Sequence, residues 1–179
     1  VHRRPVVAPD VVHKGRQQIV CDADGMIAGI AHRMPETIRP CVQIVGLEPG
    51  ASRVSGVHVM IARDRMYFFA DTTVNIRPDG GALAEIARQT AQTAREFGVT
   101  PRVAFVSYSN FGTARGPGIA EVEEALRILA KEEPDLVVDG PVHADTAVVP
   151  GVLSNLFPFS KLAGDPANVL IFTVLEAAN

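Results

Sequence analysis

Cysteine is scarce in this chain. Its two cysteines, Cys21 and Cys41, form no CxxC pair, and they are not spaced like metal ligands with the five scattered histidines. We therefore expect no metal site. The scarcity also fits a reduced, cytoplasmic setting.

Long apolar runs are missing too. The longest, from Val169 to Leu175, is broken by Thr173 and is far too short to span a bilayer, and the N-terminus has no signal-peptide hydrophobic core. The formal charge of −3 and the absence of a basic run give no reason to expect a nucleic acid or an anionic membrane as partner. The start at Val1 and the end in mid-pattern predict a fragment of something longer.

The motifs of common catalytic machineries are also absent. There is no GxSxG, HExxH or SxxK sequence and no kinase-type set of motifs. The glycines Gly112, Gly116 and Gly118 fit neither a P-loop nor a dinucleotide-binding fingerprint. These absences direct attention to binding loops.

Strand-like and helix-like segments alternate along most of the chain. Apolar spacing predicts helices over 83–97, stopped by Gly98, and over 119–129. Strands are predicted at 42–45, 102–106, 134–140 and 167–175, and a hairpin at 53–71. The alternation predicts an α/β fold with a mainly parallel sheet flanked by helices, to which the hairpin adds antiparallel strands at one edge.

Residues 102–118 read as a strand, a polar glycine-rich loop and the start of a helix. In open α/β sheets, ligands bind at the carboxyl ends of the strands. Glycines let backbone N–H groups approach an anion, a helix N-terminus attracts it, and Arg115 adds a full positive charge. The loop therefore either binds an anionic ligand or simply turns the chain.

Three other polar segments, 71–75, 139–145 and 176–179, follow predicted strands. If they meet the 107–118 loop at one sheet edge, they form a polar cleft for an anionic or amide-bearing ligand. Asp139, His143 and Asp145 resemble an acid/base set, but caps and surface roles are the favoured interpretation. Asp22 or Asp24 is expected to cap a helix that starts near Met26.

Several stretches together resemble the phosphate acetyl/butyryltransferases, or phosphotransacetylases, over nearly everything after Ile19. The matching residues are 22–29, 38–40, 43–46, 49–56, 69–75, 83–87, 107–113, 139–140, 144–145, 167–172 and 178–179. Finer details resemble the C-terminal phosphotransacetylase-like domain of hybrid NADP-dependent malic enzymes. These are Asn110-Phe111 where the transferases usually have Thr-Lys, the segment 71–76, and the segment 156–160.

The resemblance implies a three-layer α/β/α fold of the phosphotransacetylase or isocitrate dehydrogenase type, with two domains and a ligand cleft between them. Residues 1–46 would be a remnant of the first domain, and 47–179 the second, inserted domain. A partial first domain exposes apolar surface, so we expect a homo-oligomer or another compensating contact.

By the same resemblance, the chain is expected to bind acetyl-CoA or a related acyl-CoA as a regulatory ligand of a malic enzyme. NADP and a divalent metal would belong only to that enzyme's absent domain. One alternative is a phosphate acetyltransferase that moves an acetyl group between acetyl phosphate and CoA, with Arg39 as its principal catalytic candidate. Another is a dimerisation scaffold with an inactive cleft.

The residues expected to contact acyl-CoA or phosphate are Arg39, Asp71, Asn75, Ser109, Asn110, Gly112, Thr113, Arg115 and Asp145. Two departures from the transferase pattern argue against activity in this chain. His32-Arg33-Met34-Pro35 lacks the hydroxyls of the usual His-Ser-Thr. The family's later Ser-Arg pair and Asp lie beyond Asn179, so this fragment itself is expected not to be catalytic.

Overall fold

The computed structural model describes residues 6–7, 26–27, 33–62 and 64–178. The chain divides into two compact units, Val1–Arg53 and Val54–Asn179, each described here by itself. That the second is a domain inserted into the first stays a prediction, and the expected cap by Asp22 or Asp24 lies outside the described residues. Among the described residues, no helix is long and apolar enough to cross a bilayer.

The first unit holds two short parallel strands, β1 (Val6–Val7) and β2 (Met26–Ile27), and helix α1 (Met34–Ile44). The prediction of a helix start near Met26 is wrong, because Met26 lies in β2. The strand predicted at 42–45 is also wrong, because α1 extends to Ile44.

Two prolines obscured α1 in the sequence. Pro35 lies in the first turn, where a backbone N–H would make no hydrogen bond within the helix, so its lack of an N–H costs nothing. Only Pro40, further along, removes a hydrogen bond from the helix. Glu36 supports the helix start by accepting the Arg33 N–H at 3.0 Å. Gly46, with φ of 87°, follows the helix and donates its N–H to the Val42 carbonyl.

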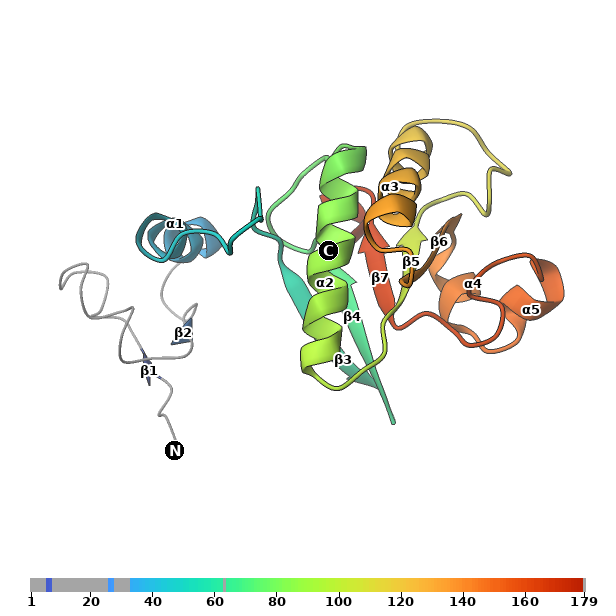
Figure 1. The fold of residues 1–179 in the computed structure, drawn as a ribbon, viewed down its shortest axis with the longest axis horizontal. Helices are drawn as coiled ribbons and strands as arrows, with labels where there is room; N and C mark the ends of the chain where they lie inside the picture. The colour runs from blue at the N-terminus through green and yellow to red at the C-terminus, as the bar shows by residue number, and fades with distance from the viewer. Residues whose placement is uncertain (1–5, 8–25, 28–32, 63, 179) are drawn as a thin grey trace. The chain divides into compact units, whose positions relative to one another are not determined.

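The second unit is built on a five-stranded sheet with the order β3-β4-β7-β5-β6 (Figure 1). Its strands are β3 (Val57–Ala62), β4 (Arg65–Ala70), β5 (Arg102–Val106), β6 (Val137–Val142) and β7 (Val169–Phe172). Only β3 and β4 pair antiparallel, and the other neighbours are parallel. This confirms the predicted mainly parallel sheet with an antiparallel hairpin at its edge.

Helices cover both faces of this sheet. They are α2 (Gly80–Glu96), α3 (Ile119–Glu132), α4 (Ala144–Val148), α5 (Val152–Leu156) and the last turn, α6 (Leu175–Ala178). Val103 and Phe105 pack with α2 and α3 on one face, whereas Ala104 points to the other face and packs with Ala147 of α4 and Leu153 of α5. The predicted three-layer α/β/α fold is therefore confirmed.

Helix α2 ends before Gly98 as predicted, but it begins at Gly80, ahead of the predicted start at residue 83. The Asp79 Oδ1 accepts the Ala82 N–H at 2.7 Å, and Gly98, with φ of 74°, follows the last turn. Phe97, the last residue of the predicted helix, follows α2 and is 53 % exposed, and its ring contacts Phe68 edge-on with ring centroids 5.7 Å apart.

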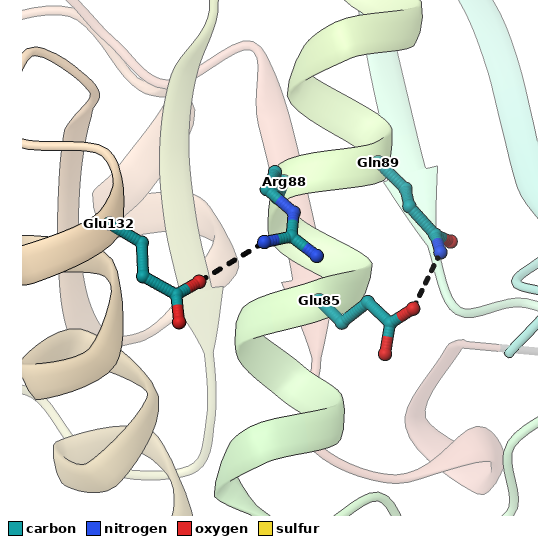
Figure 2. Close-up of polar contacts among 4 residues, drawn as sticks. All are labelled: Glu85, Arg88, Gln89 and Glu132. Atoms are coloured by element: carbon teal, nitrogen blue, oxygen red, sulfur yellow. Dashed lines mark hydrogen bonds and ion pairs between the residues drawn. The ribbon is translucent and has the colours of Figure 1, made fainter. Parts of the chain in front are cut away.

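Polar contacts add to the apolar packing of α2 (Figure 2). Arg88 of α2 and Glu132 of α3 form an ion pair of 3.1 Å, and the Gln89 side chain donates to Glu85 one turn earlier. The Ser55 hydroxyl, just before β3, donates to the Gln89 Oε1 at 2.8 Å. Helix α2 is thereby joined both to α3 and to the start of the hairpin.

Strand β7 comes last in the chain but lies between β4 and β5. Asn168 holds its start, because its carbonyl accepts the Phe68 N–H at 2.8 Å and its Oδ1 accepts the Arg102 N–H at 2.8 Å. The Asn168 side chain also donates to the Thr100 carbonyl. The strand predicted at 167–175 is shorter in the structure, because the chain leaves the sheet after Phe172 and turns into α6.

Strand β6 continues two residues beyond its predicted end, through Gly140 and Pro141 to Val142. The register of β6 against β5 shifts between Ala104 and Val106, and this shift allows β6 to continue through Gly140 and Pro141. Gly140 has a φ of 143°, and a Cβ there would lie 2.8 Å from the Phe105 carbonyl oxygen. Glycine is therefore required by both backbone conformation and close approach.

We predict that Gly140→Ala lowers the free energy of unfolding by about 1–3 kcal/mol, because alanine is strained at this φ and collides with the backbone of β5. Chemical denaturation measures the change. Gly164→Ala is the matched control, since a Cβ at Gly164 meets nothing within 4 Å. Equal stability of the two variants would contradict the role assigned to Gly140.

Candidate functional site

The carboxyl ends of four parallel strands form one edge of the sheet, here called the carboxyl edge. Asp71, Ser107, His143 and Thr173 follow the last residues of β4, β5, β6 and β7, so parallel pairing brings their segments to this edge. Strand β6 runs on to Val142, so the predicted segment 139–145 begins inside the strand.

Asp71 organises the turn that follows β4. Its side chain is almost fully buried, and its Oδ1 accepts the N–H groups of Gly56, Thr73 and Val74 at 2.9–3.0 Å. Its Oδ2 accepts the Asn75 N–H at 2.8 Å and also the Asn75 side-chain amide. Five donors thus surround one carboxylate, so both residues act within the turn.

These contacts set the charge state of Asp71. Burial alone would raise the pKa of its carboxyl, but hydrogen bonds from the Thr73 N–H, the Asn75 side chain, and the Gly56 and Asn75 N–H groups outweigh burial. Together they hold the pKa of Asp71 below its ordinary value. The carboxylate is therefore charged at neutral pH and stabilises the turn in that form.

The 107–118 loop is held by its own hydroxyl groups. Ser109 is buried, and its Oγ accepts the Ala114 N–H at 2.9 Å and lies 3.3 Å from the Thr113 Oγ1. The same Thr113 hydroxyl accepts the Asn110 N–H at 3.2 Å. Gly112 takes the turn between them with φ of 82°. Ser109 and Thr113 therefore shape the loop.

Asn110 joins this loop to the end of β6. Its Oδ1 accepts the His143 N–H at 2.8 Å, and the His143 Nε2 lies 2.9 Å from the Tyr108 carbonyl oxygen. The Phe111 N–H donates to the Pro141 carbonyl at 2.7 Å. Two of the predicted strand-end segments are thus in direct contact, as the cleft hypothesis requires.

Arg115 is a cation of this edge. Its side chain is exposed, and among the residues that the structure describes its guanidinium has no hydrogen-bond or ion-pair partner. It follows a loop held by Ser109, and the next residue, Gly116, lies close to the hydroxyl of the exposed Tyr108 side chain. The arrangement presents one free positive charge on a shaped backbone, which suits an anionic ligand.

The remaining predicted residues belong to other segments of the chain. Arg39 lies in α1 of the first unit, and its role stays a prediction. Asp145 is exposed in the first turn of α4, where its Oδ1 accepts the Thr146 N–H at 2.7 Å. Asp139 accepts from the Ser160 hydroxyl and the Lys161 N–H at 2.8–2.9 Å, a structural role like the one favoured from the sequence.

At the fourth segment, α6 takes the place of the expected loop. The Leu175 N–H donates to the Ile76 carbonyl, which joins this end of the chain to the turn after β4. Among the described residues, no group of three or more His, Cys, Asp or Glu side chains is placed to hold a metal ion.

Sequence reasoning missed a cleft at the opposite, amino-terminal edge of the sheet. It has a volume of about 650 Å³ and is lined by Ile61, Asp64, Arg65, Met66, Tyr67, Val99, Arg102 and residues 165–168. The Arg102 guanidinium donates to the Asp165 and Lys161 carbonyls, so it closes a loop there. No motif in the sequence indicated this cleft, because its residues come from three distant segments.

Solved structures share this fold. A phosphotransacetylase from Staphylococcus aureus matches with a TM-score of 0.77 and 42 % identity, over 88 % of this chain and 48 % of that one. A phosphotransacetylase from Streptococcus pyogenes matches with a TM-score of 0.80 and 40 % identity over the same shares. The second unit thus lies within a fold known from phosphotransacetylases.

The sequence comparisons identify the family. The profile of the phosphate acetyl/butaryl transferase family matches residues 4–179, and the chain belongs to this family. Phosphate acetyltransferases of Staphylococcus aureus (strain N315) and Bacillus subtilis (strain 168) are 42 % identical over 161 residues and 41 % over 157 residues. Each alignment covers 88 % of this chain and 49 % or 48 % of the relative, so the chain spans about half the length of these relatives.

The lowered pKa of Asp71 predicts a defined pH dependence of stability. The Asp71 carboxyl has a lower pKa in the folded protein than in the unfolded chain, so its ionised form stabilises the fold. This stabilisation is fully present above the unfolded-state pKa of about 3.9, and it is lost as the pH falls through the pKa of the folded state. Asp71→Asn removes this contribution and places an amide donor against the Asn75 donors. We expect a loss of about 1–3 kcal/mol at pH 7.

Denaturation of the wild type and the variant from pH 7 to pH 2 measures this effect. The stability difference is expected to shrink below about pH 4, as the wild-type carboxylate takes up a proton. Asp135→Asn is the control, because Asp135 is exposed. This substitution is expected to change the free energy of unfolding by no more than about 0.5 kcal/mol. A difference at Asp71 that does not vary with pH would contradict the charged-carboxylate account.

Proposed function

We propose that this chain is part of a phosphate acetyltransferase, which moves an acetyl group between acetyl phosphate and CoA. The observation that carries the proposal is the 42 % identity, over 161 residues, to relatives named phosphate acetyltransferases. The match to the family profile, over residues 4–179, includes the whole carboxyl edge, from the turn at Asp71 to the strand end at Thr173. The predicted alternative of a transferase is therefore favoured over the regulatory domain.

The proposed reaction makes few demands on acid/base groups. The CoA thiol attacks the acetyl carbonyl, a carbon–sulfur bond forms, the bond from the acetyl carbon to the phosphate oxygen breaks, and the thiol proton passes to the released phosphate or to solvent. Catalysis then depends on holding two anionic substrates in line and stabilising phosphate charge. A shaped loop with the free cation Arg115 suits this task, and we assign the phosphate of acetyl phosphate to Arg39.

The malic-enzyme hypothesis gains no support from the comparisons, in which nothing shows a malic-enzyme domain. It depended on Asn110-Phe111, on the segments 71–76 and 156–160 and on the missing hydroxyls at 32–35, and both Asn110 and Phe111 have structural contacts of their own. Asn110 accepts the His143 N–H, and the Phe111 ring lies 5.0 Å from that of Phe157. Regulation by acyl-CoA thus has no observation of its own in its favour.

We predict that the full-length protein forms acetyl-CoA from acetyl phosphate and CoA, and that Arg39→Gln lowers kcat/KM for acetyl phosphate by about 10²–10³-fold. The expected cause is loss of a positive charge that stabilises the phosphate in the transition state. A spectrophotometric assay of thioester formation measures both quantities. Arg127→Gln is the matched control, because Arg127 is exposed on α3 and away from the carboxyl edge.

Two results would count against this proposal. Full-length protein that binds CoA but forms no acetyl-CoA would favour a regulatory domain, and protein that binds no CoA at all would favour a scaffold. Equal activity of Arg39→Gln and Arg127→Gln would leave the transferase proposal standing and remove Arg39 from it.

A further inference from the structure

Three phenylalanines form a cluster beside the 107–118 loop. Phe111 belongs to that loop, and Phe157 and Phe159 come from the segment after α5. The ring of Phe111 lies 5.0 Å from that of Phe157 and 5.1 Å from that of Phe159, and the rings of Phe157 and Phe159 are 6.1 Å apart. We call these residues the aromatic cluster. Their tilted and edge-on contacts are the favourable geometries for such rings.

The cluster is anchored on one side and open on the other. Phe111 and Phe157 are half-buried and pack against the core between the sheet, α4 and α5. Phe159 is 71 % exposed, although it contacts both of the other rings. A large ring held by aromatic neighbours and exposed to solvent is a ready stacking surface for a planar ligand.

The backbone around Phe111 supports this position. Phe111 has φ of 49°, in the left-handed region that bulky residues rarely adopt, and its N–H donates to the Pro141 carbonyl at 2.7 Å. Such a conformation persists where surrounding contacts impose it, and it is commonest at ligand sites. The cluster is therefore tied to the carboxyl edge.

Positive charge accompanies the cluster in the 107–118 loop, where Arg115 follows Phe111. Within the described part of the chain, the Arg115 side chain has no hydrogen-bond or ion-pair partner. The other segment turns away from this edge after Phe159, because the Lys161 carbonyl accepts from the Arg102 guanidinium at the amino-terminal edge. An aromatic platform beside a loop with a free cation matches a nucleotide, whose base stacks and whose phosphates are anionic.

We propose that Phe159 is the stacking platform for the adenine base of CoA, with Arg115 supplying positive charge for the phosphates of the same 3′-phosphoadenosine diphosphate moiety. This inference rests on the proposed function, since it assigns one end of the proposed substrate to a surface. The thioester end of CoA then extends from the aromatic cluster along the carboxyl edge.

Calorimetric titration of the full-length protein tests the platform. Phe159→Ala is expected to weaken CoA binding by between about 5-fold and about 150-fold, which corresponds to loss of one base–aromatic stack. It is expected to leave the binding of 4′-phosphopantetheine, which lacks the adenosine, unchanged. Leu156→Ala is the matched control, because Leu156 is 65 % exposed on the neighbouring α5 but has no aromatic face.

A second variant gives a direct optical readout. Phe159→Trp keeps an aromatic face and adds one tryptophan to residues 1–179, which contain none. Its fluorescence is expected to be quenched by CoA and by adenosine 3′,5′-bisphosphate, and not by 4′-phosphopantetheine. This measurement decides the question even if Phe159→Ala is poorly folded.

The outcomes separate the two proposals. If the wild type binds CoA and Phe159→Ala binds it equally well, or if the Phe159→Trp fluorescence does not respond to adenosine 3′,5′-bisphosphate, the platform is overturned and the transferase proposal stands. If the wild type binds no CoA, the proposed function fails and the platform fails with it.

Discussion

The second unit depends on the insertion of its last strand into the middle of its sheet. Without β7, strands β4 and β5 have no neighbour to join them, because neither pairs with the other. Asn168 makes this junction specific, since its backbone and side chain bond both to Phe68 of β4 and to Arg102 of β5. The same insertion aligns four parallel strands, so the loops that follow them meet at one edge. The candidate site is thus a consequence of strand order.

Much of this fold could be predicted because its signals are local. Alanine-rich spacing and a final glycine indicate α2, and alternation around a short turn indicates the hairpin. Helix α1 was missed because prolines in its sequence look like breaks, although Pro35 is favourable in a first turn. The ends of β6 and β7 were misplaced because they depend on partners far along the chain. The approach of Gly140 to Phe105 is one example that no local pattern contains.

The candidate site was predicted in outline but not in its details. Parallel pairing made it foreseeable that the loop at Ser109 would meet the end of β6, and the bond between Asn110 and His143 is that contact. Polar residues in a loop look alike in a sequence, whether they face a ligand or each other. Ser109, Thr113 and Asp71 proved to bond within their own turns, which only coordinates could reveal. Family resemblance to the transferases was correct, while the finer resemblance to malic enzymes rested on residues with local structural roles.

The turn after β4 has a consequence for how such a site can change during evolution. Asp71 reaches mainly backbone N–H groups, at Gly56, Thr73, Val74 and Asn75, and only one side-chain amide. Backbone donors are present whatever side chain a residue carries, apart from proline. The path of the turn is therefore set mainly by Asp71 and by Gly56, where a Cβ would collide with the Thr73 side chain. A substitution at Val74 keeps the N–H that Asp71 accepts, so this position can vary while the path of the chain stays constant.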